Sequence, residues 1–176
     1  MSGTGKSILV LGGARSGKSH YAEALASGWN GKKIYLATAE PGDAEMAARI
    51  EAHRARRGSD WRTVSALLNL PDALREVSED DAFILIDCLT IWLSNVFLAE
   101  SDCAGAVEGL LEALDHTRGT TVLVSNEVGG GIVPENAMAR RFRDIAGETN
   151  QKVAAIVDEV VLVTAGLPQV LKPSTK

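Results

Sequence analysis

The triplet Gly-Lys-Ser occurs twice near the start of the chain, at residues 5–7 and 17–19. The second copy completes the pattern G-x-x-x-x-G-K-[ST], after an apolar run at 8–11 and before a helical pattern. A strand that leads through a glycine-rich turn into a helix can wrap phosphates with backbone N–H groups and the helix N-terminus. Lys6 lacks a preceding strand and leads into one, so we interpret the first triplet as coincidence.

The second copy assigns a role to each residue type. Lys18 is expected to reach the β- and γ-phosphates of a nucleotide and to be catalytic, and the Ser19 hydroxyl is expected to ligate Mg²⁺. Arg15 could contact phosphate or remain solvated, and the pattern does not distinguish the two. The residues expected to bind the nucleotide here are Gly12, Gly13, Ala14, Arg15, Ser16, Gly17, Lys18 and Ser19.

A nucleotide site of this kind also needs an acid at the end of a neighbouring strand. The segment AFILID at 82–87 places Asp87 there. We favour a role for Asp87 in holding Mg²⁺, directly or through water. The alternative is that Asp87 caps the helix that begins near Leu89.

A histidine stands among arginines in the helix expected over residues 43–57. Spacings of three and four residues place four side chains on one face: Arg49, His53, Arg56 and Arg57. Met46 and Ile50 are expected nearer the opposite side, toward the core. Neighbouring guanidinium groups favour a neutral, nucleophilic imidazole and could hold a polyphosphate. Spacing alone favours the alternative, a solvated basic face with an incidental histidine.

The elements that position these residues alternate along the chain. Apolar runs without polar alternation predict strands buried on both faces, and their alternation with helices predicts a parallel sheet. Strands are expected at 8–11, 34–37, 61–65, 83–86, 121–124 and 160–163, and helices at 17–28, 43–57, 71–77, 89–99, 104–116 and 134–157, with Gly147 as a candidate break in the last. The fold class is α/β, a three-layer P-loop NTPase-like domain. Residues 1–6 and 172–176 are expected to be frayed.

Length and composition limit the alternatives. With 176 residues, the chain is expected to form a single domain. A net charge of −5 argues against nucleic-acid binding. Cys88 and Cys103 form no metal or disulfide pattern, which favours a reducing cytoplasm. The apolar stretch 82–99 contains Asp87, so we interpret it as a strand and a helix and expect no membrane span.

Taken in their order along the chain, the motifs resemble those of the adenosylcobinamide kinase / adenosylcobinamide-phosphate guanylyltransferase family of cobalamin biosynthesis. The resemblance extends over nearly the whole chain. The segments that carry the resemblance are ILVLGGARSGKS, YLATAE, DAEMAARIEAHRARRGSDWRT, ILIDCLTIWLSN, VLVSNEVGGGIVPENAMARRFRDIAGETNQKVAAIVDEVVLVTAGLP and the final LK.

This resemblance implies two activities at one site. ATP or GTP phosphorylates adenosylcobinamide, and GMP from GTP then passes through a histidine–GMP intermediate to adenosylcobinamide phosphate, giving adenosylcobinamide-GDP. His53 matches that histidine. Further nucleotide contacts are implied at Ala37, Thr38, Ala39, His53, Arg54, Ala55, Arg56 and Asp87. The family is trimeric, with sites near subunit boundaries, so a homotrimer is expected.

Two positions depart from the family pattern. Ser65 stands where the family usually carries a glutamate that helps bind the nucleotide, and Gly58 stands where a proline is usual. A serine cannot offer a carboxylate to a guanine edge. If Ser65 reflects a lost activity, the alternative function is a P-loop small-molecule kinase without guanylyl transfer. A non-catalytic nucleotide-sensing module is a third hypothesis, of a different class. The loop 128–136 could contact the corrinoid or serve as a connector.

Overall fold

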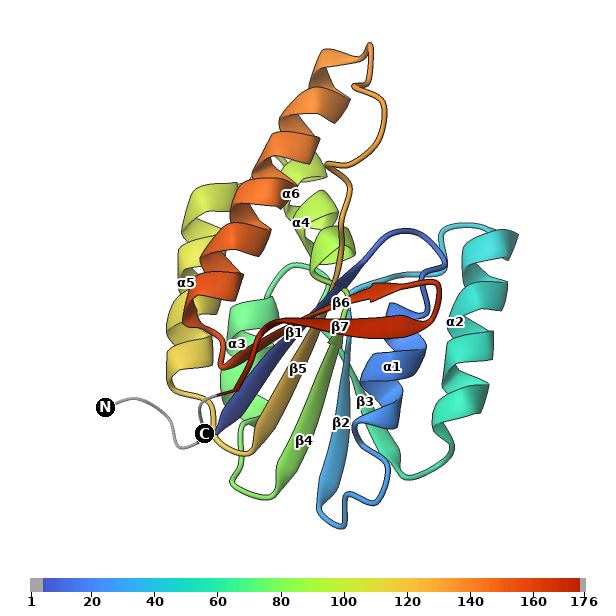
Figure 1. Cartoon of the computed structure of the whole chain (residues 1–176), viewed down its shortest axis with the longest axis vertical. Coiled ribbons are helices and arrows are strands. Elements are labelled where there is room, and N and C mark those ends of the chain that lie inside the picture. The colour runs from blue at the N-terminus through green and yellow to red at the C-terminus, as the bar shows by residue number, and fades with distance from the viewer. Residues whose placement is uncertain (1–4, 175–176) are drawn as a thin grey trace.

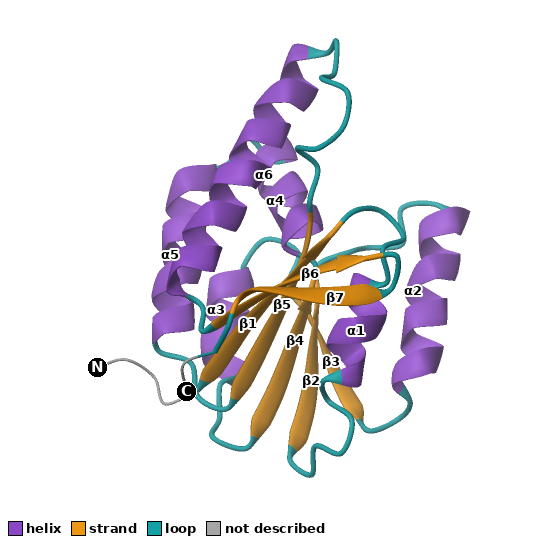
Figure 2. Ribbon diagram, viewed as in Figure 1, coloured by secondary structure: helices purple, strands orange, loops and turns teal. Residues whose placement is uncertain are grey.

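The computed structural model describes residues 5–174, which form one seven-stranded sheet with helices on both faces. The strands are β1 (Lys6–Gly12), β2 (Lys32–Ala37), β3 (Trp61–Ser65), β4 (Ala82–Asp87), β5 (Thr120–Asn126), β6 (Glu159–Thr164) and β7 (Leu167–Lys172). Their spatial order is β3-β2-β4-β5-β1-β6-β7, with every neighbouring pair parallel except β6 and β7 (Figure 2). The mostly parallel sheet predicted from the apolar runs is confirmed.

Helices cover the two faces unequally. The helices are α1 (Lys18–Ala24), α2 (Ala44–Arg57), α3 (Leu70–Val77), α4 (Leu89–Leu98), α5 (Cys103–Asp115) and α6 (Ala137–Ile156). In Figure 1, α1 and α2 lie on one side of the sheet, and α3 to α6 lie on the other. This is the expected three-layer arrangement. α1 is shorter than expected, whereas α6 continues through Gly147 without a break.

Alternation along the strands divides the core into two apolar clusters. Leu9 and Leu11 of β1 belong to the larger cluster, beneath α3 to α6, whereas Ile8 and Val10 belong to the smaller one, beneath α1. Successive strand residues point to opposite faces, so one apolar run serves both clusters. Trp92 fills the centre of the larger cluster and is fully buried.

Both ends of the described chain are more ordered than the sequence indicated. Lys6 is the first residue of β1 and pairs with Glu159 at 2.8 Å. Strand β7 was not predicted, because its side chains are mostly exposed and it lacks a buried apolar pattern. Lys172 ends it and donates to three carbonyls at the end of α6, those of Ala154, Ala155 and Val157. The rest of the termini expected to fray includes residues 1–4 and 175–176, which lie outside the described residues.

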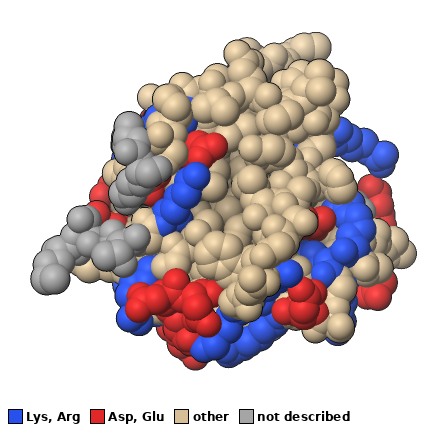
Figure 3. Space-filling view, turned by 60° about the horizontal axis from the view of Figure 1, so that its bottom comes forward, with Lys and Arg blue, Asp and Glu red and all other residues tan. Residues whose placement is uncertain are grey.

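Charged side chains of both signs share the surface of the molecule. Figure 3 shows basic and acidic side chains intermixed on the face it presents, rather than a single-sign basic surface. Exposed pairs include Lys152 with Glu108 at 2.7 Å and Arg118 with Asp80 at 3.6 Å. Among residues 5–174, every helix is too short or too polar to cross a bilayer.

Candidate functional site

Several of the predicted site residues meet at the carboxyl edge of the parallel strands, where open α/β sheets bind their ligands. A cavity of about 130 Å³ lies there, between the loop after β1, the ends of β2 and β4, and helix α2. Among the residues that line it are Lys18, Ser19, Ala37, Ala39, His53, Arg57, Asp87 and Asn126. Ligand sites usually exceed about 300 Å³, so this cavity accommodates part of a nucleotide.

The loop between β1 and α1 has the form that the sequence motif predicts. It leaves β1 at Gly12 and enters α1 at Lys18. Arg15 and Gly17 adopt the left-handed region, with φ of 54° and 93°. The Lys18 ammonium donates to the Gly13 carbonyl at 3.0 Å. Gly13, Ala14 and Arg15 are exposed, so the tip of the loop is open to a phosphate chain.

Behind this loop lies the turn between β6 and β7. The backbone N–H of Gly166 donates to the Ser16 carbonyl at 2.8 Å. A Cβ atom on Gly17 would come within 3.1 Å of the Gly166 Cα, so the two backbones touch at a point that needs glycine. Strand β7, which the sequence did not predict, therefore supports the phosphate loop.

Asp87 ends β4 and lines the cavity, and the start of helix α4 tests one of its two predicted roles. Helix α4 starts at Leu89, and its N-cap residue is Cys88 rather than Asp87. The capping alternative is therefore wrong. Burial raises the pKa of Asp87, against the opposing effects of the His53 charge and a hydrogen bond with Ser19. Its Oδ2 atom has no hydrogen-bond partner among residues 5–174.

These features fit a divalent cation. A buried carboxylate oxygen without a hydrogen-bond partner, next to a serine hydroxyl, offers the hard oxygen ligands that Mg²⁺ prefers. Within the described residues, no cluster of three or more His, Cys, Asp or Glu side chains could hold a metal ion alone. That is expected where nucleotide phosphates and water supply most ligands.

His53 projects from α2 toward the same cavity. Asp43 caps the start of α2 by accepting from the Met46 N–H at 2.7 Å. The His53 Nδ1 atom lies 3.6 Å from Glu23 Oε1 and 3.8 Å from Asp87 Oδ2. The sequence predicted cations around this ring, but two carboxylates also face it.

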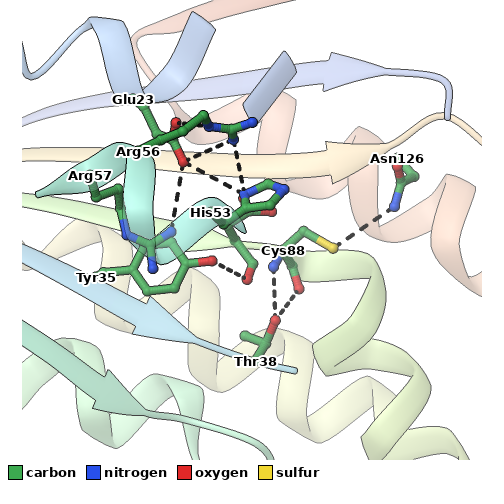
Figure 4. Close-up of polar contacts among 9 residues, drawn as sticks. Glu23, Tyr35, Thr38, His53, Arg56, Arg57, Cys88 and Asn126 are labelled. Carbon is green, nitrogen blue, oxygen red and sulfur yellow. Dashed lines mark hydrogen bonds and ion pairs between the residues drawn. The ribbon is translucent and has the colours of Figure 1, made fainter. Parts of the chain in front are cut away.

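Glu23 is the residue that sequence reasoning missed. Its carboxylate oxygens lie 3.2 Å from Arg56 Nε, 3.6 Å from His53 Nδ1 and 3.7 Å from Arg57 Nη1 (Figure 4). Burial acts to raise the pKa of Glu23, but the His53 and Arg56 side chains beside it outweigh this effect and hold the pKa below its ordinary value. One signal was available, because Glu23 lies four residues after Ser19 and so on the same face of α1.

Arg56 and Arg57 differ although they are adjacent. The Arg56 side chain is 44% exposed, and its Nη2 lies 3.2 Å from His53 Nδ1. The Arg57 side chain is 4% exposed and stacks on the Tyr35 ring at 3.4 Å from its centroid. Arg57 thus fixes the end of α2 against β2, whereas Arg56 donates two hydrogen bonds to Glu23 from a position that solvent and ligands can reach.

The facing of α2 requires a correction. Met46 and Ile50 line the same cavity as His53 and Arg57, not the opposite side of the helix. Positions 46, 50, 53 and 57 are spaced by four, three and four residues, which is one helical stripe. Arg54 and Ala55 are exposed and do not line the cavity. The side chain of Arg49 lies outside the described residues.

Thr38 joins the ends of β2 and β4. Its hydroxyl accepts from the Cys88 N–H at 2.8 Å and donates to the Cys88 carbonyl at 2.9 Å. Burial and the nearby Asp87 charge raise the pKa of the Cys88 thiol to about 12, so this cysteine is not a nucleophile. Ser65 is exposed on β3, paired in register with Ala37 at the edge of the site.

The other candidate histidines lie apart from this cavity. His20 is exposed on α1, and His116 follows α5, where its ring contacts the Glu112 carbonyl. A larger groove of about 910 Å³ separates α6 from α4 and α5, but none of the predicted site residues line it. The site at the strand ends is therefore the functional candidate.

Solved structures that resemble this one confirm the fold. The ATPase EscN of enteropathogenic E. coli, assembled with its stalk EscO, superimposes with a TM-score of 0.63 at 16% identity, over 98% of this chain and 47% of that chain. A prototypical type III secretion ATPase gives a TM-score of 0.59 at 13% identity, over 90% of this chain and 51% of that one. These neighbours are P-loop ATPases, and at such low identity they show the fold alone.

Sequence relatives are much closer. The bifunctional adenosylcobalamin biosynthesis protein CobP of Pseudomonas aeruginosa is 46% identical over 166 residues, covering 93% of this chain and 96% of its own. CobU of Salmonella typhimurium, described by the same words, is 43% identical over 176 residues, covering 91% and 96%. The family described as cobinamide kinase / cobinamide phosphate guanyltransferase matches residues 8–171. The chain belongs to that family of bifunctional enzymes.

Proposed function

We propose that the two activities of the family, the kinase and the guanylyl transfer, share the cavity between the phosphate loop and α2. The substrates are adenosylcobinamide, its phosphate, and ATP or GTP with Mg²⁺. The observation that carries this proposal is the position of His53, 3.8 Å from Asp87 in a cavity that Lys18 and Ser19 also line. A nucleophile and a phosphate loop thus face one another across one carboxylate.

In the kinase step, the chain acts mainly by positioning. Backbone N–H groups of the loop and the Lys18 ammonium hold the β- and γ-phosphates, and the substrate hydroxyl displaces the terminal phosphoryl group. Lys18 gives up its bond to the Gly13 carbonyl to do so. A ring nitrogen is not needed for this reaction.

In the guanylyl step, a His53 nitrogen attacks the α-phosphorus of GTP. The new N–P bond forms as the α–β P–O bond breaks, and pyrophosphate leaves with that electron pair. A phosphate oxygen of adenosylcobinamide phosphate then attacks the same phosphorus, the N–P bond breaks, and adenosylcobinamide-GDP is released. The loop that holds the β- and γ-phosphates in the kinase step now holds the leaving group.

Ser19 and Asp87 are the residues that would hold Mg²⁺. When bound, the ion neutralises charge on the phosphates of the nucleotide. The orphaned Oδ2 of Asp87 is the observation that supports this assignment. Ala37 and Ala39, which line the cavity, and Thr38, which fixes the strand end between them, are proposed to contact the rest of the nucleotide. Arg54 and Ala55 stay predictions from the family resemblance.

Assembly and location complete the proposal. We expect a homotrimer in the cytoplasm, as the family resemblance implies. Exposed apolar side chains support a subunit interface: Ile132 is 97% exposed, Val133 61% and Met138 56%. Light scattering coupled to gel filtration measures the oligomeric state, and a monomer would contradict this part.

A kinase without guanylyl transfer is the second candidate. It is favoured by Ser65, which lies at the edge of the site beside Ala37 and cannot act as a carboxylate. Under this alternative His53 would remain unlabelled by GTP.

One experiment separates the two candidates. Purified protein is incubated with [α-³²P]GTP and Mg²⁺, and denatured protein is examined for acid-labile, base-stable label. Wild type and the His20→Ala control, whose histidine is exposed on α1, should be labelled, whereas His53→Ala should not. His53→Ala should also make no adenosylcobinamide-GDP while still phosphorylating adenosylcobinamide. Formation of adenosylcobinamide-GDP by His53→Ala at the wild-type rate would falsify the proposal.

A further inference from the structure

We propose that Glu23 is a positioning residue that selects the reactive tautomer of His53, and that Arg56 holds the opposite tautomer until a triphosphate draws it away. This inference rests on the proposed role of His53 as the nucleophile. It assigns the covalent step a built-in dependence on nucleotide binding, through residues on two helices, α1 and α2.

The His53 Nδ1 atom faces three charged groups. Arg56 Nη2 lies 3.2 Å away, Glu23 Oε1 lies 3.6 Å away and Asp87 Oδ2 lies 3.8 Å away. In Figure 4 the Nδ1 edge of the ring points toward Glu23 and Arg56, and the other ring nitrogen points away from both. Nδ1 is thus the nitrogen that the protein controls, and Nε2 is the one left for chemistry.

The partner of Nδ1 decides where the proton lies. A neutral imidazole has one nitrogen that donates and one that accepts, and a guanidinium can only donate. While Arg56 donates to Nδ1, the ring proton is on Nε2, and Nε2 has no lone pair with which to attack phosphorus. The arrangement with Arg56 bound to the ring is therefore the unreactive one.

The reactive arrangement needs a hydrogen-bond acceptor at Nδ1, and Glu23 is placed to be it. Its side chain is 10% exposed and is the nearest carboxylate to Nδ1. Its lowered pKa keeps it ionised, so it accepts and does not donate. A separation of 3.6 Å is just beyond hydrogen-bond distance, as is common for catalytic contacts before substrate binds.

Asp87 is the other carboxylate near the ring, but a different task is proposed for it. Its contact with Ser19 and its buried Oδ2 atom direct it toward the proposed cation. A carboxylate that binds a metal ion is a weaker acceptor for a ring N–H. Glu23 is therefore the acceptor that remains once nucleotide and cation are in place.

The exchange follows from the difference between the two arginines. Arg56 is 44% exposed, so a phosphate can compete for its guanidinium with a charge-assisted, bidentate bond. Arg57 stays stacked on Tyr35 and ion-paired with Glu23 at 3.7 Å. When Arg56 leaves, Arg57 still holds the Glu23 carboxylate in place, and Nδ1–H can turn to it.

The proton balance is simple in this scheme. The Nδ1 proton remains on the ring, hydrogen-bonded to Glu23, while the Nε2 lone pair forms the bond to phosphorus and pyrophosphate departs. The ring then bears a positive charge that the carboxylate stabilises. When the acceptor phosphate takes the GMP group, the ring leaves as the same neutral Nδ1–H tautomer.

The direct test is the tautomer itself, in wild-type protein. Protein labelled with ¹⁵N-histidine is compared by NMR with and without Mg²⁺ and a GTP analogue that has a methylene bridge between the α- and β-phosphates. A labelled His53→Ala sample identifies the His53 signals. We expect the Nε2–H tautomer in the free protein and the Nδ1–H tautomer in the complex. The same tautomer in both samples overturns the proposal.

The kinetic test uses Glu23→Gln, with Glu51→Gln as a matched control on the exposed surface of α2. A glutamine offers both a donor and an acceptor, so it cannot select one tautomer. Single-turnover formation of labelled protein from [α-³²P]GTP should slow by about 10–100-fold, as for other residues that orient a functional histidine. Kinase turnover and the thermal unfolding profile show whether the variant is folded.

The outcomes separate this inference from the function beneath it. Labelled wild-type protein together with wild-type labelling rates in folded Glu23→Gln overturns the role of Glu23 and leaves the function intact. Unlabelled wild-type protein overturns the function as well. If Glu23→Gln does not fold, the NMR comparison of wild-type samples still decides.

Discussion

The two helices that frame the site are attached to the molecule by different forces. Helix α1 packs Ala22 into the smaller apolar cluster, with Tyr21 against its edge. Helix α2 contributes no described side chain to either apolar cluster, and among its described side chains the one that is buried is Arg57. Its contacts to α1 are the ion pairs of His53, Arg56 and Arg57 with Glu23.

This difference matches the chemistry of the two sides. A phosphate loop works by having its N–H groups already in place, and apolar burial fixes α1 without competing for phosphate. A nucleophile that must change its hydrogen-bond partner is better held by charges that a ligand can rearrange. The phosphate side is fixed by packing, and the nucleophile side by charge.

The largest expected effect is on the fixed side. Lys18→Ala removes the cation that holds the β- and γ-phosphates in both reactions, so both kinase and guanylyl transfer should fall by about 10²–10³-fold, as when one electrostatic contact to a transition state is lost. Steady-state rates of each reaction measure this. The matched control is Lys6→Ala in the other Gly-Lys-Ser triplet, whose ammonium pairs with Glu159 at 2.8 Å. Equal losses in the two variants would contradict the choice of loop.

The support behind the loop should be the next most sensitive. Gly166 has φ of 79°, so Gly166→Val forces a β-branched residue into the left-handed region at a cost of about 1–2 kcal/mol. Because its N–H holds the Ser16 carbonyl, KM for the nucleotide should rise in both reactions, and the melting temperature should fall by about 2–8 °C.

Gly28→Val is the control for this change. Gly28 has φ of 78° and open space around its Cα, so the backbone strain is matched but the phosphate loop is not touched. It should lose similar stability and keep the wild-type KM. A raised KM in Gly28→Val would show that the effect is general destabilisation.

The ion pairs between Glu23 and α2 should make the stability of the protein depend on pH. The pKa of Glu23 is lowered in the folded protein, so its contribution is present above its ordinary pKa of about 4.3 and is lost as the pH falls through the lower folded value. Glu23→Gln should therefore be less stable than wild type at pH 7, by about 1–2 kcal/mol. The gap should close in acid, as thermal melts between pH 7 and pH 3 measure. A gap that is constant with pH would sink this assignment.

Whether a strand could be predicted from the sequence depended on which of its side chains are buried. β1, β4 and β5 are apolar on both faces, and their runs were recognised with nearly correct limits. The exposed strand β7 carries no such pattern, because its role is to pair with β6 and support the loop. Local composition cannot predict a strand that is specified by its neighbour.

The site residues differ in the same way: some could be predicted from their own segment, and others depend on a neighbouring helix. The loop motif follows β1 and Asp87 is the last residue of β4, so position along the chain was enough to bring them together. Glu23 was missed because it is a surface-type residue on a short helix, and its role arises only when α2 lies beside it. Met46 and Ile50 were assigned to the wrong side, since the arginines were taken as the reference for the face and Arg57 turned out to be buried.

The smallest expected effect concerns the attachment of α2. Amide hydrogen exchange should be faster in α2 than in α1, because exchange follows local opening and α2 buries little apolar surface. Raising the salt concentration from about 0.1 M to 1 M shortens the screening length from about 10 Å to about 3 Å. Of the three α2 side chains that pair with Glu23, Arg56 is the one that is exposed, so its pair with Glu23 is the one that salt screens most. An exposed pair contributes about 0.2–1 kcal/mol, so exchange in α2 should rise by no more than about fivefold. The apolar contacts of α1 are not screened by salt, and exchange there should not accelerate. A parallel acceleration in both helices would mean that charge does not distinguish the two sides of the site.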